Sequence, residues 1–375
     1  MFAKRGCDSK RVLRVLLVIA WLQGTALAGP TPSDITHPDP NGAVRASDDP
    51  APDPGAGSGS SSPWIDLSPS NVLERHAGAV DGDHEDHKLR AALELSTFYA
   101  GFSAWAYVAW YRNHPPLSGF KVGGDGWFGV ETYAGGADKL GHLWATMALG
   151  RMGTAILTEG GWDHTRSAIV SAALSELVFL NVEIRDGLYF EFSPGDLTLD
   201  TIGALLGIAL DLSPRLDELF DFRVQYFPSA RYIDNVDGDP NKDGSPSCPK
   251  GGCSRWNIAE DYSGQTYMLA LHLGAIEPLR ERAVWTRFVD VGLGFQTRGY
   301  KPPPDPSDHV IARQQLFVGV SLNAQGLFDY LLEGGNHETL RKISHGIFEV
   351  FNLPYTILGA GVGREAPGKP HSGGA

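Results

Sequence analysis

The chain has little cysteine, little methionine and no excess of basic residues. Of its 375 residues, 3 are Cys and 4 are Met, and 31 Lys and Arg stand against 44 Asp and Glu, for a formal net charge of −13. A chain this acidic, with no basic stripe beyond its first residues, is not suited to bind nucleic acid. HExxH, CxxC and GxSxG are also absent, which removes the usual signatures of zinc proteases, thiolate metal sites and serine hydrolases.

The first 28 residues read as a secretory signal peptide. Basic residues come first, residues 15–22 are apolar, and Ala26-Leu27-Ala28 is a small-x-small cleavage site. The alternative, a membrane anchor, is less favoured because a span needs about 20 apolar residues. Cys7 precedes the apolar run, so it does not have the position of a lipoprotein cysteine. We expect an exported protein of the periplasm or outer-membrane surface.

Two cysteines follow the signal peptide, Cys248 and Cys253, at the ends of the loop CPKGGC. An even count in an exported protein predicts a disulfide between them. Two unpaired surface thiols are the alternative.

Composition divides the rest of the chain into four segments. Residues 29–85 are rich in Pro, Gly, Ser and Asp and predict a disordered linker. Residues 86–225 predict a helical domain, residues 226–363 a β-rich segment containing an Asp/Asn loop, and residues 364–375 a disordered tail. The predicted fold is α+β: a bundle of about four apolar helices followed by a β-rich antiparallel segment.

The hydrophobic periodicity and the helix-capping residues support that division. Apolar, helix-like segments occupy residues 91–111, 138–157 and 163–184, and a further helix begins at a Ser193 cap followed by Pro194. Period-two alternation then predicts strands at residues 269–274, 289–296 and 316–323, and a helix near 338–351 and a strand near 355–361 end the ordered part.

Ionisable residues recur at helical spacing on the apolar helices. Asp138 and His142 are four residues apart, as are Asp196 and Asp200, so each pair shares a helix face. Such groups cost free energy unless they are paired or used. We predict a polar cluster between helices, made of Asp138, Lys139, His142, Glu183, Asp186, Asp196 and Asp200.

Three interpretations of this cluster stay open on sequence. It is a polar network that fixes helix packing, with Lys139 and Arg185 as counter-ions; or a divalent-metal or acid/base site; or a pocket for a ligand or lipid headgroup. Asp196 also has a purely local interpretation, as the acid of a capping box with Ser193.

A second candidate metal site lies in the loop after residue 225. Asp239, Asn241 and Asp243, followed by Gly244, match the start of an EF-hand calcium loop, and Asp237 adds a carboxylate. The twelfth position is Lys250 instead of Glu, so the alternative is an Asp/Asn/Gly turn. The cofactor prediction is accordingly Ca²⁺ or another divalent metal.

The motifs ADKLGH, EIRDG and FSPGDLTLDTIGALLG, in this order, resemble the YfiM-like periplasmic lipoproteins, an uncharacterised bacterial envelope family, and more distantly the VanZ-like membrane proteins. The resemblance covers roughly residues 91–211. The matching positions are Asp138, Lys139 and His142, then Glu183, Asp186 and Gly187, then Ser193, Asp196, Asp200 and Gly203; the family often has Asn where this chain has Asp200.

The resemblance implies a location at a membrane surface and carries no known activity. We therefore predict an uncharacterised exported cell-envelope protein, associated with a membrane surface or envelope lipids, in a structural or accessory role. The alternative is a metal-dependent hydrolase that acts on an envelope lipid or glycan with the same acids as ligands.

Overall fold

The computed structural model describes residues 84–366 apart from 113, 124–125, 238–257, 301–310 and 333–337. The described residues all belong to one compact unit, Asp81–Ala375. The predicted signal peptide, nearly all of the predicted linker, the Cys248–Cys253 pair and three residues of the predicted calcium loop, Asp239, Asn241 and Asp243, lie outside the described residues. Asp237 is the last residue of a short helix.

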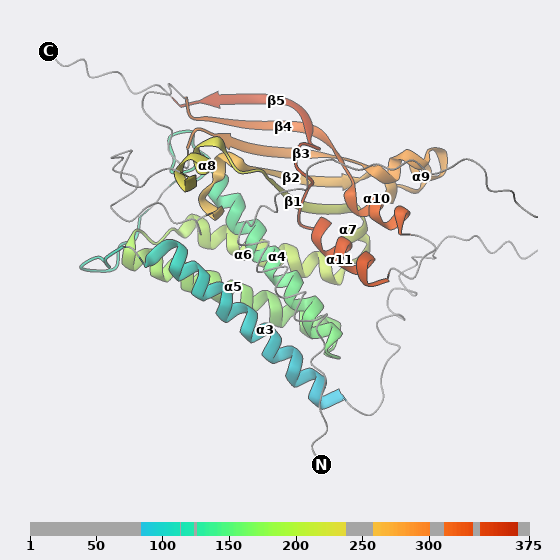
Figure 1. The fold of residues 1–375 in the computed structure, drawn as a ribbon, viewed down its shortest axis with the longest axis horizontal. Helices are drawn as coiled ribbons and strands as arrows, with labels where there is room; N and C mark the ends of the chain where they lie inside the picture. The colour runs from blue at the N-terminus through green and yellow to red at the C-terminus, as the bar shows by residue number, and fades with distance from the viewer. Residues whose placement is uncertain are drawn as a thin grey trace, which may run out of the picture. The chain divides into compact units, whose positions relative to one another are not determined.

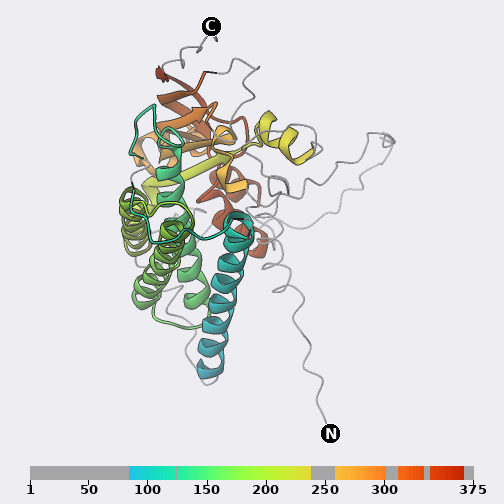
Figure 2. The ribbon, with the colours of Figure 1, turned by 90° about the vertical axis from the view of Figure 1, so that its left-hand side faces the viewer.

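Four long helices form the first half of the described residues, as predicted (Figure 1). They are α3 (His84–Ala106, continued by a π-helical turn, Tyr107–Tyr111), α4 (Ala137–Glu159), α5 (His164–Tyr189) and α6 (Pro194–Leu212). α4 is the central helix and contacts α3, α5 and α6. In Figure 2, α5 and α6 lie side by side on one side of α4 and α3 lies on the other.

Small residues explain how closely these helices approach. A Cβ atom at Gly203 of α6 would lie 2.3 Å from the backbone oxygen of Leu143 in α4, and one at Gly153 of α4 would lie 2.8 Å from Oγ of Ser171 in α5. Neither position can take a larger side chain without moving a helix. The buried polar residues of α4 are therefore held against both neighbouring helices.

A five-stranded antiparallel sheet follows, with the strands side by side in chain order (Figure 1). The strands are β1 (Phe220–Tyr226), β2 (Gln265–His272), β3 (Val289–Arg298), β4 (Arg313–Leu322) and β5 (Leu358–Glu365). The α+β prediction is confirmed. Two boundaries differ: β1 begins inside the stretch assigned to the helical domain, and Arg364 and Glu365, assigned to the tail, belong to β5.

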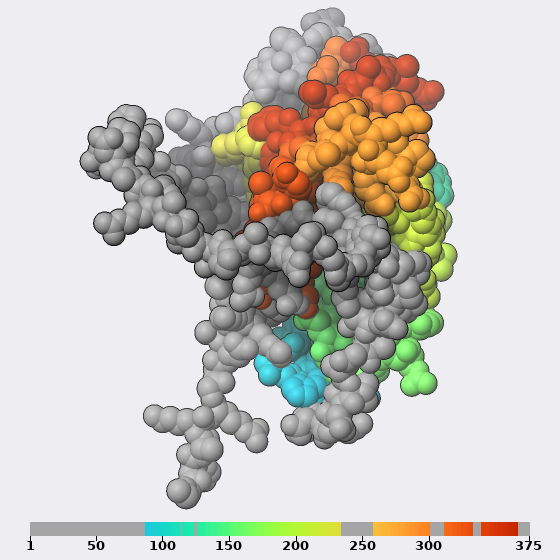
Figure 3. Space-filling model, turned by 90° about the vertical axis from the view of Figure 1, so that its right-hand side faces the viewer, coloured from blue at the N-terminus to red at the C-terminus, as the bar shows by residue number. Residues whose placement is uncertain are grey.

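Short helices connect and flank the strands: α7 (Pro214–Leu219), α8 (Ala230–Asp237), α9 (Glu277–Arg282), α10 (Ala324–Leu331) and α11 (Glu338–Phe348). Figure 3 shows the side on which the orange and red C-terminal elements lie directly above the green helices. Asn323 caps the start of α10, and its side chain accepts a 2.7 Å hydrogen bond from the Gly326 amide.

The two faces of the sheet have opposite character because successive side chains alternate. On one face, Phe222 and Tyr267 pack against Met147 of α4 and Leu210 of α6. The same face continues beyond the helices as exposed aliphatic side chains: Leu293, Leu316, Val318, Val320, Leu358 and Val362. The other face carries buried charged residues.

Phe317 of β4 fills that second face between three strands. A Cβ atom at Gly294 of β3 would lie 2.0 Å from the Phe317 ring, and one at Gly359 of β5 would lie 2.3 Å from it. A Cβ at Gly361 would lie 2.5 Å from the Phe317 Cα atom. The glycines of β3 and β5 therefore make the space that this one aromatic residue occupies.

Candidate functional site

The structure brings the predicted polar residues together between α4, α5 and α6. We call Asp138, Lys139, His142, Glu183, Asp186, Asp196 and Asp200 the helical cluster. The first three come from the start of α4, the next two from the end of α5 and the last two from the first half of α6. Glu183 and Asp200 are 0 % exposed and Lys139 is 1 % exposed, so the cluster is inside the bundle.

His142 and Asp200 are the centre of the cluster. His142 Nδ1 lies 3.0 Å and 3.2 Å from the two carboxylate oxygens of Asp200. The Thr146 hydroxyl, one turn along α4 from His142, donates a 2.8 Å hydrogen bond to Asp200 Oδ1. The Phe179 ring packs edge-on against the imidazole and covers it on the α5 side.

Glu183 connects α5 to the start of α6. Its Oε2 accepts a 3.1 Å hydrogen bond from the backbone amide of Ser193, the residue that caps α6. This corrects the capping-box interpretation of Asp196, because the Ser193 amide is bound by Glu183 and the Asp196 carboxylate pairs with Lys139. Glu183 Oε1 accepts no hydrogen bond and lies 3.8 Å from His142 Nδ1.

Lys139 is the counter-ion of the other two acids near the start of α4. Its Nζ lies 2.5 Å from Asp196 Oδ1 and 3.4 Å from Asp138 Oδ2. Asp138 also accepts a hydrogen bond from the Tyr262 hydroxyl, which ties the cluster to the segment that leads into β2. The Ser193 hydroxyl accepts a 3.3 Å hydrogen bond from the Asp196 amide, as the sequence predicted for a helix cap.

Asp186 lies at the edge of the cluster next to aromatic residues. It accepts a 2.8 Å hydrogen bond from the Tyr111 hydroxyl. Arg185, predicted as a counter-ion, instead lies over the rings of Tyr107 and Tyr111, at 5.7 Å and 5.9 Å from their centroids. Its charge is therefore used in cation–π contacts.

Burial changes the protonation of the cluster. It raises the pKa of Glu183 to about 9 and that of Asp186 to about 7. Burial alone would lower the pKa of His142, but the charges of Asp200 and Asp196 more than offset it and the pKa is raised well above its usual value. Burial thus favours the neutral form of Glu183, while the neighbouring acids favour the charged form of His142.

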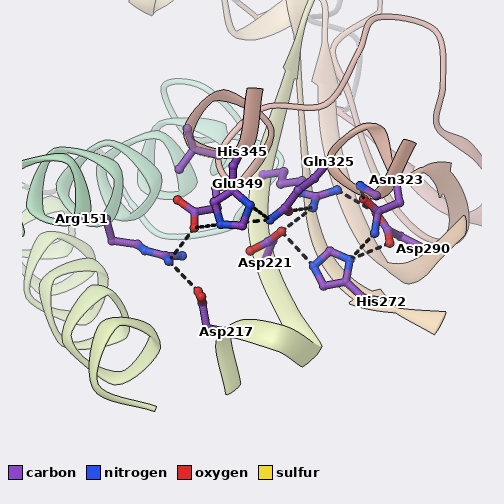
Figure 4. Close-up of polar contacts among 12 residues, drawn as sticks. Arg151, Asp217, Asp221, His272, Asp290, Asn323, Gln325, His345 and Glu349 are labelled. Atoms are coloured by element: carbon purple, nitrogen blue, oxygen red, sulfur yellow. Dashed lines mark hydrogen bonds and ion pairs between the residues drawn. The ribbon is translucent and has the colours of Figure 1, made fainter. Parts of the chain in front are cut away.

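A second buried network, which sequence reasoning missed, lies on the polar face of the sheet. We call Asp221, Arg223, His272 and Asp290 the sheet cluster. Arg223 donates a 2.7 Å hydrogen bond to Asp290 and a further one to Asp221. His272 bridges the same two acids, with Nδ1 2.7 Å from Asp290 and Nε2 2.9 Å from Asp221 (Figure 4).

Ion pairs and hydrogen bonds join the sheet cluster to the helices, beginning at Gln325, whose side chain accepts a 3.4 Å hydrogen bond from Arg223. Arg151 of α4 contacts Asp211 at 3.0 Å, Asp217 at 2.5 Å and Glu349 at 3.0 Å. Glu349 also lies 3.2 Å from His345, whose ring nitrogen is 2.5 Å from the Gln325 amide (Figure 4). Alternation of charged and apolar residues in Asp221-Phe-Arg-Val was the one available signal for this network.

The fold and the helical cluster define an α+β protein with polar residues inside its helical bundle. A comparison with known protein families matches the helical part of the chain. Residues 124–211 match the family described as "Predicted periplasmic lipoprotein (DUF2279)". The match spans α4, α5 and α6 and so contains the whole helical cluster. It supports a likeness to an uncharacterised periplasmic lipoprotein family and export to the periplasm, and it does not single out the YfiM-like or VanZ-like proteins.

Searches of the curated proteins and of the solved structures found no match. Among the described residues, α5 has the length and composition of a membrane-crossing helix. Buried core helices share these properties, so the residues that α5 exposes decide what it can contact.

Proposed function

We propose that this protein is an exported accessory protein of the cell envelope that lies on a lipid bilayer through the outer side of α5 and α6. The observation that carries the proposal is that no charged residue of these two helices is exposed between Ser167 and Leu210, because those of the described bundle are buried or half-buried there. The periplasmic lipoprotein match is in keeping with this location.

The outer side of α5 is almost entirely aliphatic. Arg166 is exposed, and beyond it every exposed residue of α5 is uncharged. The ionisable residues of this stretch are buried or half-buried. Glu183 is buried, Arg185 lies over the rings of Tyr107 and Tyr111, and the half-buried Glu176 accepts a 2.7 Å hydrogen bond from the exposed Thr201 of α6. α6 repeats the pattern, because its first two acids, Asp196 and Asp200, are buried in the cluster.

The exposed residues of the two helices form one surface, which we call the α5–α6 face. Its members are Ile169, Val170, Ala173, Leu174, Leu177, Asn181, Ile184, Leu188, Pro194, Thr198, Thr201, Ile202, Leu205 and Leu212. A contiguous surface of exposed apolar side chains on a folded protein marks a site of contact with another molecule or a membrane. The adjoining loop adds Phe120 and Val122, which are 50 % and 63 % exposed.

Geometry favours a helix pair that lies along the membrane over one that crosses it. The stretch of α5 whose exposed residues are all uncharged, residues 169–188, is about 29 Å long at 1.5 Å per residue, close to the hydrocarbon thickness of about 30 Å. However, α4 and α6 cover the opposite side of α5, so lipid reaches only one side. One apolar side and one protein-covered side are the arrangement of an interfacial helix.

In this proposal the role of the helical cluster is structural. Its hydrogen bonds join all three helices: Asp200 to His142, Glu183 to the start of α6, and Lys139 to Asp196. The hydrolase alternative lacks an open substrate site, because Asp138, Glu183, Asp196 and Asp200 are 0–8 % exposed.

Vesicle binding tests the proposal. Mature protein would be floated with vesicles of phosphatidylethanolamine and phosphatidylglycerol, and compared with Leu177→Glu/Leu205→Glu, whose parent side chains are 58 % and 60 % exposed. Burial of a leucine stabilises by about 1.5–3 kcal/mol. Losing two partly exposed ones costs about 2–4 kcal/mol, or about 30- to 1,000-fold in affinity.

The matched control is Leu89→Glu/Leu93→Glu on α3, at 62 % and 58 % exposure. There the same change falls beside the exposed Arg90–Glu94 ion pair, and we expect wild-type vesicle binding. Equal binding by the two double variants, or no binding by wild type, would remove the proposal. Because all four positions are exposed, both variants should keep the wild-type circular dichroism spectrum.

A further inference from the structure

We propose that His142, Glu183 and Asp200 bind one divalent transition-metal ion, Zn²⁺ or Mn²⁺, inside the helical bundle. The three residues come one each from α4, α5 and α6. The proposal does not depend on membrane binding, because the site faces the interior and the α5–α6 face is on the outside.

The spacing of the three candidate ligand atoms fits a metal centre. His142 Nδ1 lies 3.0 Å from Asp200 Oδ1 and 3.8 Å from Glu183 Oε1, and the three ligand atoms all lie within 4.8 Å of one another. Metal–ligand bonds of about 2.0–2.2 Å in tetrahedral geometry place ligand atoms about 3.3 Å apart. The observed separations lie on either side of that value, so small side-chain rotations complete the site.

A second observation, independent of the spacing, is the state of Glu183. Its side chain is 0 % exposed, yet Oε1 accepts no hydrogen bond and is directed at the imidazole. A buried carboxyl oxygen without a partner is costly, and a metal ion bound there would displace the protons of Glu183 and His142. Asp200 and Glu183 are meanwhile held in place by their other contacts, the Thr146 hydroxyl at 2.8 Å and the Ser193 amide at 3.1 Å. Such hydrogen bonds orient metal ligands in known sites.

The neighbouring acids form a similar group that is already neutralised. Asp138, His142 and Asp196 also have the spacing of metal ligands, but Lys139 Nζ lies 2.5 Å from Asp196 and 3.4 Å from Asp138. A lysine ammonium there takes the place of a metal ion. The Glu183–Asp200 side of His142 contacts no lysine or arginine among the described ion pairs, which is why we assign the metal to that side.

The ligand types select the class of metal. Imidazole suits Zn, Fe, Ni and Cu, and carboxylates suit Mn, Mg and Ca. One nitrogen and two carboxylates therefore favour Zn²⁺ or Mn²⁺ over Ca²⁺ or Cu⁺. The His142 side chain is 15 % exposed, against 1 % for Glu183 and 0 % for Asp200, so the imidazole is the side from which an ion enters.

The experiment measures metal binding by the mature protein after chelator treatment. Equilibrium dialysis against Zn²⁺ and Mn²⁺ separately, read by elemental analysis, gives stoichiometry, and calorimetry gives Kd. The test variant is Glu183→Gln, which keeps an oxygen for the Ser193 amide. The matched control is Glu176→Gln, on the same helix two turns away and outside the cluster, bound to Thr201.

We expect Glu183→Gln to lose one metal per chain, or to bind it at least about 100-fold more weakly, and Glu176→Gln to match wild type. X-ray absorption of the zinc-loaded wild type should show one imidazole nitrogen with oxygen ligands; this measurement needs no variant and still decides if Glu183→Gln does not fold. Equal stoichiometry and affinity in the two variants, or a spectrum without imidazole, overturns the proposal. So does the absence of binding to wild type.

Discussion

Replacing Arg223 with methionine tests whether the sheet cluster holds the fold together. Arg223 is 0 % exposed and its guanidinium contacts Asp221 and Asp290. Burial alone would raise the pKa of Asp221, but the charges of Arg223 and His272 more than offset it and lower the pKa to about 2. Methionine fills a similar volume but leaves two buried carboxylates with only His272 as counter-ion.

The expected loss of stability in Arg223→Met follows from this excess of buried carboxylates over counter-ions. Removing one partner from a buried ion pair costs about 3–5 kcal/mol, because the remaining charge stays buried without compensation. For a unit of this size we expect Tm to fall by about 6–20 °C. Thermal and urea unfolding, followed by circular dichroism, measure both quantities.

The control is Arg215→Met, which removes an exposed arginine from its 2.9 Å pair with Glu218. Exposed pairs contribute about 0–1 kcal/mol, so this variant should unfold nearly as wild type does. Adding Asp290→Asn to Arg223→Met removes one of the uncompensated charges and should recover part of the loss. The reasoning fails if Arg223→Met is within about 1 kcal/mol of Arg215→Met, or if Asp290→Asn makes it less stable still.

Two further predictions concern pH and helix packing. Burial alone would lower the pKa of His272, but its hydrogen bonds to Asp221 and Asp290 raise it from 6.5 to about 9. The resulting stability of about 3 kcal/mol is complete below pH 6.5 and is lost as the pH rises through 9. Urea unfolding should therefore show a smaller loss of stability between pH 6 and 10 in His272→Gln than in wild type. Gly203→Ala would place Cβ 2.3 Å from a backbone oxygen of α4 and should destabilise the protein by about 1–3 kcal/mol in thermal unfolding. The control is Gly101→Ala in α3, where no atom lies within 4 Å of the added Cβ; it should be neutral or stabilising by up to about 1 kcal/mol in the same measurement.

Much of the helical half is readable from sequence because its signals are local. Asp138 and His142 share a helix face by spacing alone, and Ser193 marks the start of α6 by its position before Pro194 and Asp196. The order of the apolar helices and the alternating strands then indicates α+β. Which acid contacts which base depends on how three helices pack, and that is set by contacts such as Gly203 against Leu143, which no spacing rule reports.

The sheet cluster was missed for a different reason. Its members lie on β1, β2 and β3, so Arg223 and Asp290 are 67 residues apart in sequence. Alternation of polar and apolar residues shows that two faces of a strand differ, but it does not show which face is covered. Here the charged face is buried, and part of the aliphatic face, such as Val318 at 64 % exposure, is open.

The Phe317 ring limits how the strands can pair. Its ring lies in the room left by Gly294 of β3 and Gly361 of β5, which pair with it, and by Gly359, the next residue of β5 on the same face. Sliding β5 by two residues keeps every side chain on its original side. In one direction Ile357 takes the place of Gly359 and fills the room, whereas in the other Gly361 and Gly363 take the two places and leave it open. One aromatic residue thus opposes slippage of β5 in one direction, because only that shift places a side chain where its ring must lie.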